Sequence, residues 1–344
     1  MVTKSPYSRL KKILPVMLAA LAALILLGIA VGTVYVPVDK VFRIILKNWG
    51  LLPGAEFPAG QEPIIYLVRF PRVIVAVLVG AALATSGAVM QGMFRNPMAD
   101  PGILGVSSGA GLGAIVSIVL GLSGRSMFLL PLFASVGAIA AVSIIYMLAA
   151  SHGRIPPLTL ILSGIAVSTF ISAITTLILT NMKEYQMKAY VFWTLGSLRD
   201  KAWEHAGLIA VPVIVCIVIL FTFARDLNVL LLGDEEAQAV GLDPARTRRL
   251  LLLFTSITTA VAVSVSGPVS FIGLIVPHIV RLITGPDHRI LIPASALGGA
   301  MFLVGCDMIS RVANETSVGI VTSLIGAPYF LYLLIKARKE GVVI

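Results

Sequence analysis

The sequence has few charged residues and almost no cysteine. Asp, Glu, Lys and Arg make up only 12% of its 344 residues, against 58% hydrophobic residues. A soluble core has no room for that much apolar surface. The composition therefore excludes an ordinary water-soluble protein and predicts an all-α chain that crosses a membrane many times. Cys216 and Cys306 both lie inside apolar runs and form neither a disulfide pattern nor a metal-binding pattern.

Several catalytic motifs are also missing. The chain contains no G-x-x-x-x-G-K-[ST] sequence, so it has no P-loop with which to bind ATP. It contains no H-E-x-x-H either, which argues against an intramembrane zinc protease. Residues 105–109, GVSSG, match the G-x-S-x-G of hydrolases, but they open a predicted membrane helix without an evident histidine and acid partner. We therefore predict that the chain is not an enzyme and has no catalytic residues and no metal site.

Ionisable groups are nearly absent from the interior of the apolar runs. A carrier driven by protons or sodium normally places such groups near the centre of the bilayer. The charged residues closest to the runs fall at their predicted ends: Asp100, Arg281, Asp307, Arg311 and Glu315. His278 is the one candidate well inside a run, and we interpret it as a packed residue beside Pro277. This pattern argues against secondary transport and points to an external energy source.

Nine charge-free runs mark the candidate membrane spans. They are residues 13–38, 73–94, 102–124, 126–151, 155–182, 206–224, 250–277, 290–306 and 316–335. Both termini are basic, so the positive-inside rule places both in the cytoplasm, which requires an even number of crossings. Residues 250–284 are long enough for two helices, and Gly267-Pro268 can turn the chain between them. The sequence thus predicts ten transmembrane helices.

We expect one membrane domain over residues 1–344. Its parts are a first helix at 13–36, an outer loop at 37–63, helices 2–6 within 64–225, a cytoplasmic segment at 226–249 and helices 7–10 within 250–336. The net charge of +10 is not arranged as a basic stripe interleaved with aromatics, so it indicates membrane orientation and not nucleic-acid binding.

Two stretches outside the spans have aromatic residues. In the loop at 37–63, Val41, Phe42, Ile45 and Trp49 have the spacing of the buried stripe of a short interfacial helix. Residues 181–205 are also rich in aromatics. These fit either an aromatic belt at the lipid boundary or a short helix that covers the mouth of a pore.

The segment at 226–249, which we call the charged segment, is the most charge-dense part of the chain. A long apolar run lies on each side of it. Asp234 can cap a short helix with an acidic first turn, where acids favour the positive end of the helix dipole. Gly241 can end that helix in a left-handed conformation. Asp243 can then cap a second helix with Pro244 at its first position. This pattern fits either a solvated loop with capped ends or a folded corner that transmits force to the membrane helix that follows.

Three further stretches have long, ordered motifs. Residues 69–111 read RFPRVIVAVLVGAALATSGAVMQGMFRNPMADPGILGVSSGAG, residues 267–289 read GPVSFIGLIVPHIVRLITGPDHR, and residues 317–334 read SVGIVTSLIGAPYFLYLL. Together with the charged segment they closely resemble the permease subunits of binding-protein-dependent ABC importers for iron chelates and vitamin B12. The resemblance covers about residues 64–337. It implies the type II ABC importer permease fold, with ten helices, in a bacterial or archaeal cytoplasmic membrane.

The resemblance also implies partners and a cargo. The permease would act with a second copy of itself or a paralogous permease, with two ATP-binding subunits on the cytoplasmic side, and with a substrate-binding protein outside. ATP and Mg would bind to the partner subunits, so this chain would hold no cofactor. The cargo would be an iron chelate: a ferric siderophore first, then haem or a corrinoid. A stand-alone secondary carrier or channel without an ATPase remains the alternative.

Roles for individual residues follow from the same resemblance. The residues that couple to the ATPase would be Asp234, Glu235, Glu236, Gln238, Gly241, Leu242 and Arg246. Arg69, Arg72 and Arg311 would be exposed guanidiniums that receive carboxylates of the binding protein; without the resemblance, snorkelling interface anchors are an equal alternative. Asn96 and Met98 would form a constriction at the cytoplasmic exit, although leucine is the more familiar residue at the second of these positions.

Overall fold

The computed structural model describes residues 6–32, 36–52, 57–58, 60–150 and 156–339. Helices dominate these residues, and no strand occurs among them, so the predicted all-α fold is confirmed. In chain order the helices are α1 (Pro6–Ala30), α2 (Val38–Asn48), α3 (Gln61–Pro63), the π-helix η1 (Ile64–Arg69), α4 (Phe70–Phe94), the 3-10 helix η2 (Pro101–Leu104), α5 (Val106–Val119), α6 (Leu129–Ala149), α7 (Pro157–Leu179), α8 (Glu184–Thr194), α9 (Trp203–Thr222), α10 (Ala224–Leu230), α11 (Asp234–Ala239), α12 (Pro244–Ser266), α13 (Ile272–Thr284), α14 (His288–Val312) and α15 (Val318–Lys339).

Eight helical spans within these ranges are long and apolar enough to cross a membrane. They are α1, the continuous span Gln61–Phe94, α6, α7, α9, α12, α14 and α15. Two more apolar helices, α5 and α13, have only 14 and 13 residues. A regular membrane-spanning helix has about 20 residues, so length and composition alone do not mark α5 and α13 as spans. The chain is a multi-pass membrane protein.

The predicted break between two helices in residues 250–284 is confirmed. α12 ends at Ser266 and α13 begins at Ile272. Gly267 has a φ of 68°, in the left-handed region, and a Cβ there would overlap the carbonyl oxygen of Trp193. Only glycine satisfies both conditions without strain, so this residue makes the turn possible.

Helix α4 is the centre of the bundle and is buried along most of its length. Gly80 of α4 meets Gly299 of α14 so closely that a Cβ on either residue would overlap the carbonyl oxygen of the other. A Cβ on Gly87 would likewise overlap the carbonyl oxygen of Gly273 of α13. Small residues let helix backbones approach closely in lipid, where hydrophobicity does not drive helices together. These glycines therefore determine which helices surround α4.

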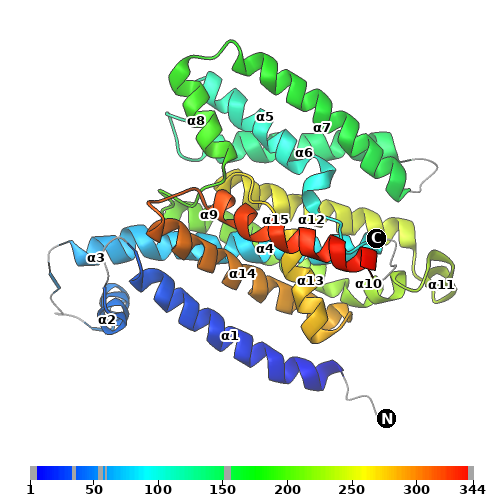
Figure 1. Cartoon of the computed structure of the whole chain (residues 1–344), viewed down its shortest axis with the longest axis horizontal. Helices are drawn as coiled ribbons and strands as arrows, with labels where there is room; N and C mark the ends of the chain where they lie inside the picture. Colours follow the sequence, from blue (N-terminus) through cyan, green and yellow to red (C-terminus); the bar gives the residue numbers. More distant parts are fainter. Residues whose placement is uncertain (1–5, 33–35, 53–56, 59, 151–155, 340–344) are drawn as a thin grey trace.

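Figure 1 shows the arrangement of the helices around this centre. Helices α5–α8 form a layer on one side of α4, α12 and α15, and α1 lies on the other side. Helix α11, the start of α1 and the end of α15 lie at one end of the molecule, which we call the α11 end. Helices α2 and α3 lie at the opposite end, which we call the α2 end.

The two aromatic stretches both form short helices. In α2, Val41 and Ile45 are buried as predicted, but Phe42 and Trp49 are more than half exposed, so that part of the predicted stripe is wrong. Ile44 completes the buried face instead, because it lies three residues after Val41 on the same side of the helix. Residues 184–194 form α8, in which Tyr190 is buried.

Candidate functional site

The two helices predicted in the charged segment are α11 and the start of α12, and α10 precedes them; the N-cap of α11 lies one residue earlier than predicted. The N-cap of α11 is Gly233, and Asp234 is the first residue of the helix. The prediction that Asp234 caps α11 is therefore wrong. Its carboxylate is engaged elsewhere: it accepts hydrogen bonds from Arg248 at 2.6 and 2.7 Å and from Arg95 at 2.9 Å. Two guanidiniums bind a carboxylate more strongly than backbone N–H groups do.

The corner between α11 and α12 is built as predicted. Gly241 has a φ of 84°, and the N–H of Leu242 donates to the carbonyl of Ala237 at 2.9 Å, which closes the end of α11. Asp243 accepts hydrogen bonds from the N–H groups of Ala245 and Arg246, both at 3.0 Å, and Pro244 is the first residue of α12. These hydrogen bonds fix the end of α11 and the start of α12, so the two helices meet at a defined corner.

Ion pairs attach this corner to the membrane helices. Arg248 lies on α12 and Arg95 follows the end of α4, so Asp234 connects three elements. Ala237 of α11 is fully buried. A hollow of about 580 Å³ lies beside α11, between the end of α4 and α12, and Arg95, Asp234 and Arg248 line it. The charged segment thus contains a folded corner held by ion pairs, and its role in force transmission stays a prediction.

The outer surface of the corner combines acids with apolar groups. Of the predicted coupling residues, Leu242 is half-buried and the rest are exposed: Asp234, Glu235, Glu236, Gln238, Gly241 and Arg246. Leu232 and Val240, which the sequence analysis missed, are 71% and 69% exposed on the same corner. Apolar groups of this size outside the membrane spans are a typical feature of a protein-binding surface.

Asn96 and Met98 lie in the turn that follows α4. The side-chain oxygen of Asn96 accepts a hydrogen bond from the N–H of Met98 at 2.8 Å, and both residues are half-buried. Arg95, directly before them, has a φ of 51°. Asn96 therefore shapes this turn, and the role of the two residues as a constriction stays a prediction.

A buried glutamine near this turn was not predicted. Gln91 of α4 donates to the carbonyls of Gly273 and Leu274 at 3.2 and 3.1 Å, and it accepts from Arg281 at 2.9 Å. These contacts join α4 to both ends of α13. The sequence offered no signal for them, because the partners lie about 180–190 residues apart.

At the α2 end, the expectation of three exposed guanidiniums is wrong. Arg69, Arg72 and Arg311 are only 5%, 6% and 2% exposed. Arg69 donates to the carbonyls of Ile29 and Ala30 at 3.2 and 3.0 Å. The snorkelling alternative fails for the same reason, since these groups point into the protein.

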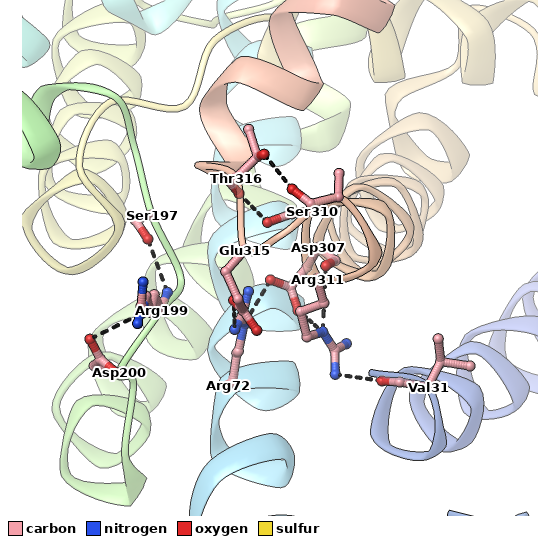
Figure 2. Close-up of polar contacts among 11 residues, drawn as sticks. Val31, Arg72, Ser197, Arg199, Asp200, Asp307, Ser310, Arg311, Glu315 and Thr316 are labelled. Atoms are coloured by element: carbon pink, nitrogen blue, oxygen red, sulfur yellow. Dashed lines mark hydrogen bonds and ion pairs between the residues drawn. The ribbon is translucent and has the colours of Figure 1, made fainter. Parts of the chain in front are cut away.

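Figure 2 shows what holds two of these arginines inside. Arg72 donates to Asp307 at 2.9 Å and to Glu315 at 2.6 Å. Arg311 pairs with the second oxygen of Asp307 at 3.1 Å and donates to the carbonyl of Val31 at 3.0 Å. Asp307 is fully buried, and a buried carboxylate is stable only when it is paired. We call Arg72, Asp307, Arg311 and Glu315 the arginine–acid cluster.

Glu315 lies at the edge of this cluster in an unusual backbone conformation. Its side chain is 28% exposed. Asn314 and Glu315 have φ values of 54° and 55°, a left-handed region that costs a non-glycine residue about 1–2 kcal/mol. The ion pair with Arg72 offsets part of this cost, so the loop between α14 and α15 depends on the cluster for its shape.

A hollow of about 570 Å³ lies next to Glu315 and opens at the α2 end. Arg199, Asp200 and Lys201, in the segment before α9, line it, and Figure 2 shows Arg199 and Asp200 beside the arginine–acid cluster. Burial lowers the pKa of Lys201 to about 8. The side chains of Arg199 and Asp200 are 64% and 90% exposed, so they are exposed charges next to this hollow, in contrast to the three buried arginines.

Comparison with known proteins identifies a matching family and close relatives. The model of the FecCD transport family matches residues 20–336. The cobalamin import system permease BtuC of Halobacterium salinarum is 46% identical over 280 residues, which cover 80% of this chain and 74% of BtuC. The hemin transport system permease HmuU of Yersinia pestis is 42% identical over 280 residues, which cover 79% of this chain and 83% of HmuU.

A solved structure shares the same fold. A metal-chelate type ABC transporter in an inward-facing conformation superimposes with a TM-score of 0.83 at 30% identity. The match covers 95% of this chain and 99% of that one. The resemblance inferred from the motifs of residues 69–111, 267–289 and 317–334 is thereby confirmed for nearly the whole chain.

Proposed function

The chain belongs to the FecCD transport family, and from that premise we propose that it is the membrane-spanning subunit of an ATP-driven importer. The importer would take a metal chelate from a docked binding protein and move it across the cytoplasmic membrane. ATP would be hydrolysed by a separate subunit, so this chain would supply the pathway and no catalytic group.

The observation that carries the proposal is the folded corner at the α11 end. A motor subunit needs a rigid element that it can grip and that continues into the membrane. The corner meets both needs. Asp234 of α11 is ion-paired to Arg95, directly after α4, and to Arg248 of α12, and α12 runs from the corner as a 23-residue span. We propose that Glu235, Glu236, Gln238 and Arg246 contact the ATP-binding subunit together with the exposed Leu232 and Val240.

The orientation follows from the two chain ends. The starts and ends of the chain are basic, and α1 and α15 have their terminal ends on the side of α11. We therefore propose that the α11 end is cytoplasmic and that the α2 end faces outward. With the eight long spans and the shorter α5 and α13, the chain would cross the membrane ten times.

For docking, we propose a revised role for the three arginines. Arg69, Arg72 and Arg311 are buried, so they would hold the shape of the α2 end and not meet the binding protein first. The groups that a docking partner would meet are Arg199, Asp200 and Lys201 at the hollow beside Glu315. Complementary charges at such a rim steer a partner and set its register.

The cargo that we propose is a large metal chelate. The sequence analysis ranks a ferric siderophore first and haem or a corrinoid next. Because two relatives are named for cobalamin and hemin, haem and a corrinoid should be assayed as well. Uptake of each chelate by proteoliposomes that contain the complete importer would identify the cargo.

The decisive experiment asks whether transport needs a motor. The chain is purified from its native host in mild detergent, and a P-loop ATPase is expected to copurify with it. Glu235→Lys and Arg246→Glu should each weaken that attachment by about thirtyfold, the equivalent of about 2 kcal/mol at an interface hot spot. Glu184→Lys, an exposed acid on α8 near the other end, is the matched control and should leave the attachment unchanged. Full uptake by this chain alone in liposomes would support the carrier alternative and refute the proposal.

A further inference from the structure

A cavity of about 310 Å³ lies between α6, α7 and α12 and has no part in the proposed coupling or docking surfaces. Its walls are apolar and include Val142 and Ile145 of α6, Leu160 of α7, and Leu252 and Leu253 of α12. A volume of this size lies at the lower end of the range for small-molecule pockets. Because all three helices are membrane spans, the molecules that reach the cavity most readily are lipids.

Arg249 is the one charged residue that lines this cavity among the described residues. Its neighbour Arg248 is bound to Asp234, but Arg249 is exposed and its side chain has no ion pair or hydrogen bond within the described ranges. It is also the last charged residue before the apolar run of α12, which puts its guanidinium at the membrane boundary. Its guanidinium therefore has no counter-ion among the residues that the structure describes.

The polar and apolar groups of the cavity are arranged in order of depth. Arg249 lies in the second turn of α12, which starts at the α11 end, and Tyr146 lies in the last turn of α6, which finishes there. The hydroxyl of Tyr146 also has no hydrogen-bond partner among the described residues. Val142 and Leu253 lie one turn deeper on the same two helices. The cavity thus has a cation and a hydroxyl toward the membrane surface and apolar walls beneath them.

From this arrangement we propose that the cavity binds one anionic phospholipid from the leaflet at the α11 end. The phosphate would accept hydrogen bonds from Arg249 and Tyr146, and an acyl chain would lie against Val142, Leu160 and Leu253. A guanidinium binds phosphate through two parallel hydrogen bonds, and basic pockets between membrane helices suit anionic head groups.

The cavity lies between two parts of the molecule that could move relative to each other. Arg249 is the last residue of the charged segment, whereas α6 and α7 belong to the separate layer of α5–α8. A lipid in the cavity therefore bridges the start of α12 and that layer. The inference rests on the membrane location of the chain and does not require the proposed transport function.

The test measures lipid binding to the full-length chain in detergent by native mass spectrometry. Phosphatidylglycerol and phosphatidylcholine of the same acyl composition are the probes. We expect one phosphatidylglycerol to bind more tightly than phosphatidylcholine, and Arg249→Gln to weaken the former by about fivefold, as expected for one arginine at a membrane surface. Leu253→Trp, which fills the cavity without changing charge, should weaken binding of both lipids.

The matched control is Arg225→Gln. Arg225 is an exposed arginine of α10 near the same end of the molecule, and it does not line the cavity. Its substitution should leave the lipid preference intact. The proposal is overturned if the two lipids bind equally, if Arg225→Gln has the same effect as Arg249→Gln, or if inorganic phosphate displaces the lipid at equal concentration. Because no ATPase or cargo is present, failure here would leave the proposed transport function untouched.

Discussion

Asp307 offers a direct test of how the α2 end is held together. Its carboxylate is fully buried and bridges two guanidiniums, from Arg72 at 2.9 Å and from Arg311 at 3.1 Å. Asp307→Asn keeps the size of the side chain but leaves both buried cations without this charge. Removing one partner of a buried ion pair typically costs about 3–5 kcal/mol. We expect a loss in this range in the free energy of unfolding.

The assay is reversible unfolding of the purified chain in mixed micelles, followed by circular dichroism. Glu315→Gln is the comparison, because Glu315 contacts the same Arg72 but its side chain is 28% exposed. Water screens a partly exposed pair, so this variant should lose only about 1 kcal/mol. The double variant Arg72→Met with Asp307→Leu should lose less unfolding free energy than the sum of the losses measured for Arg72→Met alone and Asp307→Leu alone. The reason is that the double variant removes one charge of each sign and leaves neither of the two unpaired by the other. Equal losses for Asp307→Asn and Glu315→Gln, or additive losses in the double variant, would refute this account of the cluster.

Three further predictions concern other parts of the fold. Gly80→Ala should cost about 1–3 kcal/mol of unfolding free energy, because its methyl group overlaps a backbone carbonyl, whereas Gly207→Ala, with open space around it, should be neutral or stabilising; the same unfolding assay compares them. Gly241→Val should keep the fold but lower ATP-driven uptake, since φ of 84° strains a branched residue by about 1–2 kcal/mol at the corner; unchanged uptake in the reconstituted importer would contradict this. The hydrogen bond from Arg289 lowers the pKa of Asp287 to about 2, so the ionised carboxylate contributes its full stabilisation above about pH 4 and loses it as the pH falls toward 2. Asp287→Asn should therefore flatten the dependence of the unfolding free energy on pH in that window, as measured by unfolding from pH 5 to pH 2.

Local sequence signals predicted much of the candidate site at the α11 end. The left-handed glycine at 241, the cap at Asp243 and the proline at 244 all take the predicted positions, because each depends only on neighbours within four residues. The cap of α11 was predicted wrongly for the opposite reason. Asp234 has a partner 139 residues away in Arg95 as well as one nearby in Arg248, and those charges outweigh the local cap.

At the α2 end, the contrast between local signals and distant partners is stronger. The motif RFPR suggested exposed arginines, yet Arg72 is paired with residues 235 and 243 positions further along the chain. Nothing near Arg72 in the sequence indicates that Asp307 will be buried beside it. The packing of α14 against α4 through Gly80 and Gly299 brings the two together.

The sequence alone was enough to indicate a multi-pass helical protein, the break at Gly267, the corner at Gly241 and the family. Each of these depends on composition, on local backbone preference or on long motifs that read in order along the chain. Only the tertiary structure decided which charges are exposed, because burial depends on helices from distant parts of the chain. The arginines at 69, 72 and 311 lie inside for this reason, whereas Arg249 is left at the mouth of an apolar cavity without a partner among the described residues.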